Sequence, residues 1–155
     1  MDIGDLLAPK GVVLRGGASS KRQALHALAE ATSHALGIDE SRIFDALMER
    51  EALGSTGLGS GVAVPHARLD EVNQVTAVFV RLDTPVAYEA VDDRPVDLIF
   101  GLYAPSKAGA EHLRALAAVS RALRSPELRE QLRQARTTDA IRALFVKDST
   151  AATAA

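Results

Sequence analysis

The chain has 155 residues, a length that fits one compact domain with a single hydrophobic core. Hydrophobic residues make up 47% of it and charged residues 25%, a balance typical of a globular protein rather than a disordered or fibrous one. The formal net charge is -2, and no run of Lys and Arg is dense enough to bind nucleic acid or an anionic membrane, so we expect neither partner. The chain has no Cys, which excludes disulfides, a thiolate nucleophile and Cys-ligated zinc.

The sequence shows no sign of export or membrane insertion. Residues 1–10 carry Asp2 and Asp5 and lack the basic start and long apolar stretch of a signal peptide. No window approaches the ~20 apolar residues of a membrane span. We therefore expect a cytoplasmic protein in which residues 1–148 form one domain and residues 149–155 form a disordered tail.

The first third of the chain predicts one strand and two helices. A β-branched run at residues 11–15 predicts a short strand that ends in a glycine turn. A serine-capped helix is predicted over residues 19–36, with Gly37 as its stop. Asp39 is a good N-cap for a second helix, which carries Arg50 in its last turn.

The middle of the chain predicts strands around a glycine-rich loop. Residues 54–61 are too rich in glycine for a helix or a strand. An apolar strand over residues 62–66 follows, and because Pro65 interrupts it, His66 is expected at a strand end. Three more strands are predicted over residues 75–82, 85–91 and 96–103.

The last third of the chain predicts helices, which sets the fold class. From Gly109 onward the apolar spacing is helical, with Leu113 and Leu116 on the predicted buried face. Further helices are predicted from Ser125 and over residues 139–147. Strands enclosed by helices at both ends predict an α/β fold, in which a central sheet is covered by helices on both faces. Tight connections at Thr84-Pro85 and Asp92-Asp93 predict some antiparallel pairs, hence a mixed parallel/antiparallel sheet.

One of the four histidines lies where a reactive side chain would be expected. His26 and His34 lie in a helical stretch without a glycine loop or paired acid, and we interpret both as exposed or edge-of-core residues. His66 follows a glycine loop and a proline-interrupted strand, which can hold the ring accessible while loop N–H groups face an anion. The alternative for His66 is a turn histidine beside a flexible loop.

Two other side chains allow both a functional and a structural interpretation. His112 falls in the first turn of a predicted helix, at the edge of the buried face, where it could face an anion or act as a half-buried capping residue. Arg50 could bind an anion or could only complement the helix dipole. The glycine run 57–62 lacks the last glycine of a dinucleotide fingerprint, and no Lys-Ser or Lys-Thr follows as in a Walker A loop. We therefore do not expect nucleotide binding.

Residues 50–66 resemble the active-site signature of fructose/mannitol-type enzyme IIA domains of the sugar phosphotransferase system. Segments 85–92, 95–100 and 111–113 fall in the order and at about the spacing of this family, so the resemblance covers nearly the whole chain. It is greatest to the nitrogen-regulatory branch. Two departures are mild: Ser60 stands where that branch often has Asn, and Ala67 where many members have Gly.

The resemblance implies a function for each residue of the site. It makes His66 the nucleophile that becomes phosphorylated, His112 its partner in the pocket and Arg50 a nearby cationic group. We expect loop N–H groups to assist, and the phosphate-binding residues are then Gly57, Gly59, Ser60 and Gly61. Leu58 offers an apolar rim for docking. The covalent phosphate would be the only group carried, with neither cofactor nor metal.

The partners implied are a histidine phosphocarrier protein as donor and either regulatory proteins or an enzyme IIB as acceptor. A regulatory role in nitrogen or general metabolism is the first interpretation, and a sugar-specific (fructose-type) enzyme IIA is the second. A distant third is a metal-dependent hydrolase that would recruit Asp70 or Glu111 to the two site histidines.

Overall fold

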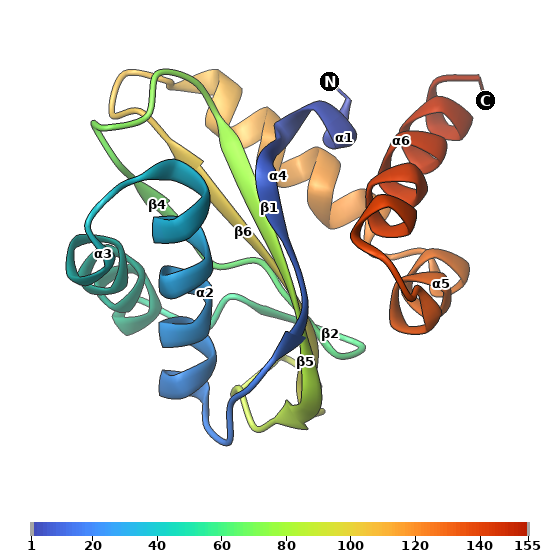
Figure 1. The fold of residues 1–155 in the computed structure, drawn as a ribbon, viewed down its shortest axis with the longest axis horizontal. Helices are drawn as coiled ribbons and strands as arrows, with labels where there is room; N and C mark the ends of the chain where they lie inside the picture. The colour runs from blue at the N-terminus through green and yellow to red at the C-terminus, as the bar shows by residue number, and fades with distance from the viewer. Residues whose placement is uncertain (1, 155) are drawn as a thin grey trace.

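The computed structural model describes residues 2–154, with side chains as far as Val146. Its strands are β1 (Leu7–Gly16), β2 (Gly57–Gly59), β3 (Val62–Ala63), β4 (His66–Arg68), β5 (Thr76–Val86) and β6 (Val96–Ala104). Its helices are α1 (Ile3–Leu6), α2 (Lys21–Leu36), α3 (Glu40–Ala52), α4 (Ala110–Ala122), α5 (Pro126–Gln134) and α6 (Thr138–Ala154). Figure 1 shows α2 and α3 on one side of the strands and α4, α5 and α6 on the other.

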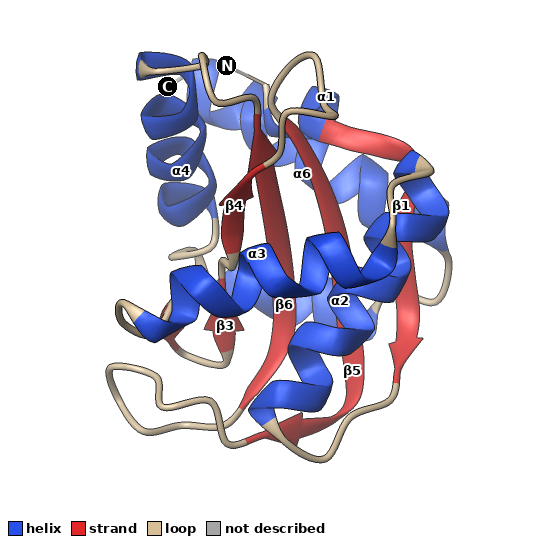
Figure 2. Cartoon of the chain, turned by 90° about the vertical axis from the view of Figure 1, so that its left-hand side faces the viewer, coloured by secondary structure: helices blue, strands red, loops and turns tan. Residues whose placement is uncertain are grey.

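The six strands form one mixed sheet in the order β1-β5-β6-β3-β2, with β4 also paired to β6. The β1–β5, β3–β6 and β4–β6 pairs are parallel, whereas β5–β6 and β2–β3 are antiparallel. Figure 2 shows α2 and α3 crossing in front of the strands. The predicted α/β fold with a mixed sheet between helices is therefore confirmed.

Each face of the sheet buries its own apolar cluster. Side chains of α1, α4, α5 and α6 pack on one face, where the ring of Phe145 meets Phe79 and Phe100 edge-on at centroid distances of 5.5 and 5.3 Å. Side chains of α2 and α3 pack on the other face, around the buried rings of Tyr88 and Tyr103. Because β6 is buried on both faces, its residues are apolar almost without alternation.

The helix boundaries follow local capping signals. Ser20 and Asp39 accept hydrogen bonds from the backbone N–H groups at the starts of α2 and α3, and Ser125 does the same for α5. Gly37 ends α2 with a φ of 72°, a left-handed conformation that glycine adopts without a steric penalty. These are the caps that the sequence predicts.

The glycine-rich run is not an open loop, because part of it forms β2. Gly57 pairs with Ala63, and a Cβ at position 57 would lie 2.8 Å from the Cβ of Ala90. Residues 59–61 all have positive φ and turn the chain into β3. The prediction that residues 54–61 form no strand is therefore wrong, since close packing between β2 and the segment before β6 requires glycine there.

Two further sequence predictions differ from the structure. Thr84 and Pro85 lie inside β5 at a bulge that tolerates the missing N–H of proline, so the antiparallel turn falls in the segment containing Asp92 and Asp93 instead. On α4 the buried face holds His112 and small apolar residues, whereas Leu113, predicted to be buried, is 68% exposed.

Helix α6 covers residues 149–154, for which the sequence predicts a disordered tail. The side chains beyond Val146 lie outside the described residues, so the tail stays a prediction.

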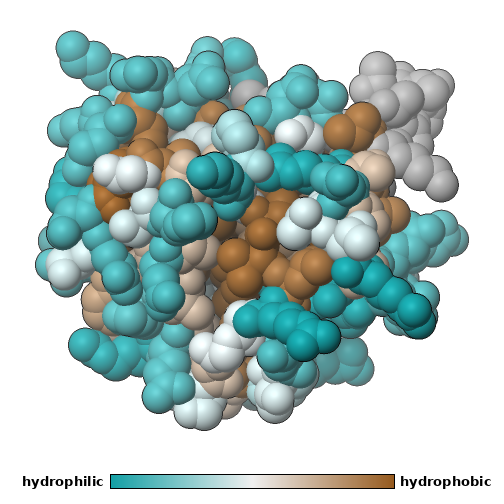
Figure 3. Space-filling model, in the orientation of Figure 1, coloured by the Kyte–Doolittle hydropathy of each residue, from teal (hydrophilic) through white to brown (hydrophobic). Residues whose placement is uncertain are grey.

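Apolar side chains gather in the middle of one molecular face, where β1 crosses it, within a hydrophilic surround (Figure 3). Strand β1 contacts both apolar clusters through two half-buried residues. Leu14 packs on one cluster and Val13 packs on the other. Among the described residues no helix has both the length and the apolar character needed to cross a membrane.

Candidate functional site

A cavity of about 600 Å³ lies between the end of α3, strand β4 and the start of α4. It contains three residues that the sequence predicts to act together, His66, His112 and Arg50. Arg68 adds another guanidinium to its wall. The cavity therefore combines two imidazoles and two cationic side chains with one acid, Glu49, so that cationic groups outnumber the acid and favour an anion.

The hydrogen-bond partners of its two ring nitrogens hold His66 in one tautomer. Its Nδ1 lies 3.0 Å from the carbonyl oxygen of Val64, and its Nε2 receives a hydrogen bond of 3.1 Å from Nε of Arg50. Because a guanidinium can only donate, Nε2 must be the unprotonated nitrogen and Nδ1 must carry the hydrogen. Burial, with a further contribution from the Arg50 charge, lowers the pKa of His66. The ring is therefore neutral at neutral pH, with a nucleophilic lone pair on Nε2.

His112 stands beside this nucleophile with an uncommitted nitrogen. The two imidazole centroids are 5.6 Å apart, and the rings meet edge to face at 77°. Burial lowers the pKa of His112, and the charge of Arg68, together with that of His66 whenever His66 is protonated, lowers it further. Its Nε2 is buried and has no hydrogen-bond partner among the described residues. A buried polar atom without a partner is costly, so this nitrogen is suited to a ligand oxygen in the cavity.

Arg50 is positioned by the end of its own helix. It lies in the last turn of α3, where its Nη1 donates a hydrogen bond of 2.8 Å to the carbonyl oxygen of Gly54. That contact satisfies a carbonyl beyond the helix end and fixes the guanidinium over the cavity. The remaining N–H groups can still donate to an anion.

The residue next to Arg50 is a buried acid. The side chain of Glu51 is only 4% exposed and pairs with Nζ of Lys21 at 2.9 Å. Its carboxylate accepts hydrogen bonds from the backbone N–H and hydroxyl of Thr56 and from the hydroxyl of Tyr88. Burial raises the pKa of Tyr88, which therefore remains a protonated donor. A buried carboxylate needs this number of partners to be tolerated.

This acid is connected to the nucleophile through the backbone. Thr56, held by Glu51, accepts a hydrogen bond of 3.0 Å on its carbonyl oxygen from the N–H of Val64. Val64 in turn uses its own carbonyl to orient the His66 ring. Glu51 thus helps to place His66 through Thr56 and Val64.

The structure does not bring the predicted phosphate-binding residues Gly57, Gly59, Ser60 and Gly61 to this cavity. The N–H of Ser60 donates to the carboxylate of Asp92 at 2.8 Å, and its carbonyl accepts from Arg133. An acidic partner at this N–H leaves no room for phosphate. None of the four residues lines the His66 cavity, and their role in phosphate binding stays a prediction.

Leu58 is exposed as predicted but lies at a different depression, beside Ser60 and Leu123. The apolar rim of the His66 cavity is formed by Leu53 and Leu113, which are 85% and 68% exposed.

Sequence reasoning missed Arg68 and Glu51 as parts of the site. A signal was present for both: Arg68 follows His66 by two residues, which places both on one face of a strand, and Glu51 is an acid next to Arg50. Asp70 and Glu111, the acids that a metal-dependent hydrolase would need, do not line the His66 cavity. Asp70 instead hydrogen-bonds Ser106, and within the described part of the chain the His66 cavity holds no cluster of three metal-binding side chains.

Comparison with known proteins defines the family. Residues 5–148 match the family model described as phosphoenolpyruvate-dependent sugar phosphotransferase system, EIIA 2. The chain therefore belongs to this family of enzyme IIA domains.

Within this family the chain is similar to nitrogen regulatory proteins. It is 43% identical to a nitrogen regulatory protein of Bradyrhizobium diazoefficiens over 141 residues, which are 91% of this chain and 92% of the relative. It is also similar to the crystal structure of nitrogen regulatory protein IIA-Ntr from Neisseria meningitidis, with a TM-score of 0.85, 35% identity and coverage of 92% of this chain and 98% of that one. A fructose-specific EIIA component of Haloferax volcanii is 39% identical over 97 residues, 63% of either chain.

The buried acid generates a stability prediction. Glu51→Gln removes the negative charge that pairs with Lys21 and accepts hydrogen bonds from Thr56. We expect this substitution to lower the free energy of unfolding by about 1–3 kcal/mol. Urea denaturation of the purified variant measures this. Glu49→Gln, an exposed acid on the same helix, is the matched control and should leave the free energy unchanged. Equal stability of the two variants would contradict the role given to Glu51.

The lowered pKa of His66 leads to a prediction about its titration. Its lowered pKa means that the fold favours the neutral ring, so this group contributes stability above the ordinary value of 6.5 and loses it as pH falls through the lower folded value. The ring signals of His66, followed by NMR across pH, should therefore titrate with a midpoint below 6.5. A midpoint at or above 6.5 would contradict the effect of burial on this ring.

Proposed function

We propose that this chain accepts a phosphoryl group on Nε2 of His66 from a histidine phosphocarrier protein and passes it on. The observation that carries the proposal is the hydrogen bond from Nε of Arg50 to Nε2 of His66, with Nδ1 held by Val64. This arrangement leaves a neutral, oriented lone pair beside a cation. Membership in the enzyme IIA family supports this interpretation.

The transfer balances without an additional base. The Nε2 lone pair of His66 forms a bond to phosphorus while the bond from phosphorus to the donor histidine nitrogen breaks and leaves its electrons on the donor. The hydrogen on Nδ1 stays in place, since it is donated to the Val64 carbonyl. Phosphoryl transfer depends on position and charge stabilisation more than on covalent chemistry from the protein.

The surrounding side chains fit the charge that builds up on the transferred group. Arg50 can shift its donors from the His66 nitrogen to the phosphoryl oxygens, and Nε2 of His112 can supply a hydrogen bond when that nitrogen is protonated. Arg68 adds positive charge at the cavity wall. Leu53 and Leu113 provide an apolar rim against which a donor protein can exclude water.

The phosphorylated state is proposed to regulate partners in nitrogen or general metabolism, in the cytoplasm. The similarity to nitrogen regulatory proteins over nine-tenths of the chain supports this assignment. The second candidate is a fructose-type enzyme IIA that passes phosphate to an enzyme IIB, favoured by the similarity to a fructose-specific component. Incubating the phosphorylated chain with a fructose-type enzyme IIB distinguishes them, because rapid loss of phosphate from His66 would favour the sugar-specific role.

The central prediction concerns the phosphorylated residue. His66→Ala should abolish phosphorylation by a phosphorylated histidine phosphocarrier protein, because no other described histidine has its Nε2 held by an arginine in a cavity. Intact-mass spectrometry after incubation reads the transfer. His34→Ala, on the surface of α2, is the control and should be phosphorylated as the wild type is. Phosphate retained on the His66 variant would overturn the proposal.

Arg50 and His112 should affect the rate of transfer without changing the acceptor. Arg50→Ala and His112→Ala each remove a donor to the transferring group, a loss typically worth ~2–4 kcal/mol of transition-state stabilisation, or roughly 10²–10³ in rate. Quenched-flow measurement of phosphate uptake gives the rate, and circular dichroism checks that each variant is folded. Wild-type rates in both folded variants would remove these residues from the mechanism.

Regulation by phosphorylation should operate through one surface. Phosphate adds nearly two negative charges between Leu53 and Leu113, and an interface that buries a dianion without a counter-charge is disfavoured. Amide shifts on phosphorylation should change around the His66 cavity and leave α5 and α6 unchanged. A regulatory partner that docks on this rim should bind the unphosphorylated chain more tightly, with His66→Ala binding like the unphosphorylated form. Equal affinity of such a partner for both forms would refute this mechanism.

A further inference from the structure

His26, Glu30 and Glu40 bring three ligand atoms together at the junction of α2 and α3. Each residue offers one nitrogen or oxygen, and these atoms all lie within 4.8 Å of one another. His26 and Glu30 are four residues apart on α2 and so share one helix face, whereas Glu40 is the first residue of α3. We propose that these three side chains bind a divalent transition-metal ion, of which Zn²⁺ is the probe.

The distances suit such an ion. Nε2 of His26 and Oε1 of Glu40 are 3.1 Å apart. Tetrahedral Zn²⁺ with nitrogen and oxygen ligands near 2.0 Å places neighbouring ligand atoms about 3.3 Å apart. The carboxylate of Glu30 lies on an exposed side chain and within 4.8 Å of the other two ligand atoms, so it can supply the third position. Water would complete the coordination, as at zinc sites with three protein ligands.

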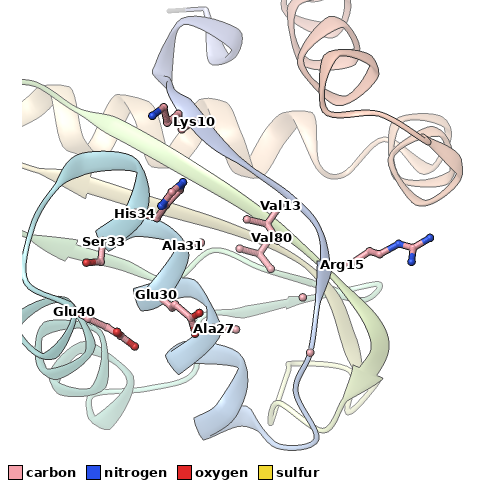
Figure 4. Close-up of a pocket in the computed structure, with 12 residues that line it drawn as sticks. Lys10, Val13, Arg15, Ala27, Glu30, Ala31, Ser33, His34, Glu40 and Val80 are labelled. Carbon is pink, nitrogen blue, oxygen red and sulfur yellow. The ribbon is translucent and has the colours of Figure 1, made fainter.

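The local charges also favour a cation. Two carboxylates face a single imidazole, and among the described residues neither Glu30 nor Glu40 forms an ion pair with Lys or Arg. Figure 4 shows the side chain of Glu40 reaching from α3 towards Glu30 on α2, while Lys10 and Arg15 point away from both. A divalent ion would neutralise the two acids where they approach each other.

An aromatic contact restrains the ring of His26. The ring packs edge-on against Phe44 of α3, with a centroid distance of 5.5 Å. The turn that joins the helices is set by the left-handed Gly37 and the Asp39 cap, so α2 and α3 keep a fixed approach. Such support lowers the ordering cost of binding. Arg50 lies at the opposite end of α3, so the ion would not occupy the His66 cavity.

Isothermal calorimetry with ZnCl₂ tests the proposal on the full chain. We expect one zinc ion per wild-type chain, no such binding in His26→Ala, and an affinity at least about tenfold weaker in Glu40→Gln and Glu30→Gln. His34→Ala removes a histidine of the same helix that is not one of the three clustered residues, and it should bind zinc normally. Zinc should also raise the Tm of the wild type but not of His26→Ala, because the ion binds only the folded site.

A second control separates this site from the histidine pair of the proposed phosphoryl site. His66→Ala should bind zinc like the wild type if the ion sits at the helix junction. Binding that survives His26→Ala, binding that disappears in His66→Ala, or no binding by the wild type would each overturn the proposal. Weaker binding at lower pH is expected as well, since protons compete with zinc for Nε2 of His26.

Discussion

The burial of one charged side chain, Glu51, is the constraint on which the site depends. A carboxylate removed from water is tolerated only when a cation and several donors compensate it, and here Lys21, Thr56 and Tyr88 do so. These partners come from α2, from the segment before β2 and from the segment after β5. One buried charge therefore connects separate parts of the chain. It supports His66 through Thr56 and the backbone of Val64.

We expect a site built in this way to accept negative charge with little change of shape. The two imidazoles and the guanidiniums are supported by the sheet, by the start of α4 and by the end of α3. A phosphoryl group would enter an environment that is already electropositive and already has an unpaired nitrogen on His112. Little reorganisation is then required when negative charge develops, which is the property that makes fixed polar groups effective in catalysis.

The sequence predicts those features that depend on neighbours along the chain. The caps at Ser20, Gly37 and Asp39 follow from single residues beside apolar periodic stretches, and His66, Arg50 and His112 do meet in one cavity. That meeting was predicted from a family resemblance, because spacing alone left both interpretations of His112 and Arg50 open.

Features that depend on distant partners could not be predicted. The α4 helix buries small residues such as Ala115 against β6, so its larger Leu113 faces outward beside the site. The glycine run forms a hairpin because Ala90, far along the chain, approaches Gly57. His26 was interpreted as having no acidic partner, since Glu40 reaches it only through the angle between two helices.

The pairing of β4 has a consequence for how the protein is made. The strand that begins with His66 pairs only with β6 among the described strands, and β6 follows it after the whole of β5. During synthesis the signature segment therefore emerges from the ribosome well before the strand that orients its nucleophile. A nascent chain that ends before β6 holds Arg50 and His66 but neither the strand pairing nor His112, so it cannot assemble the cavity. Assembly of the cavity is thus tied to completion of the sheet.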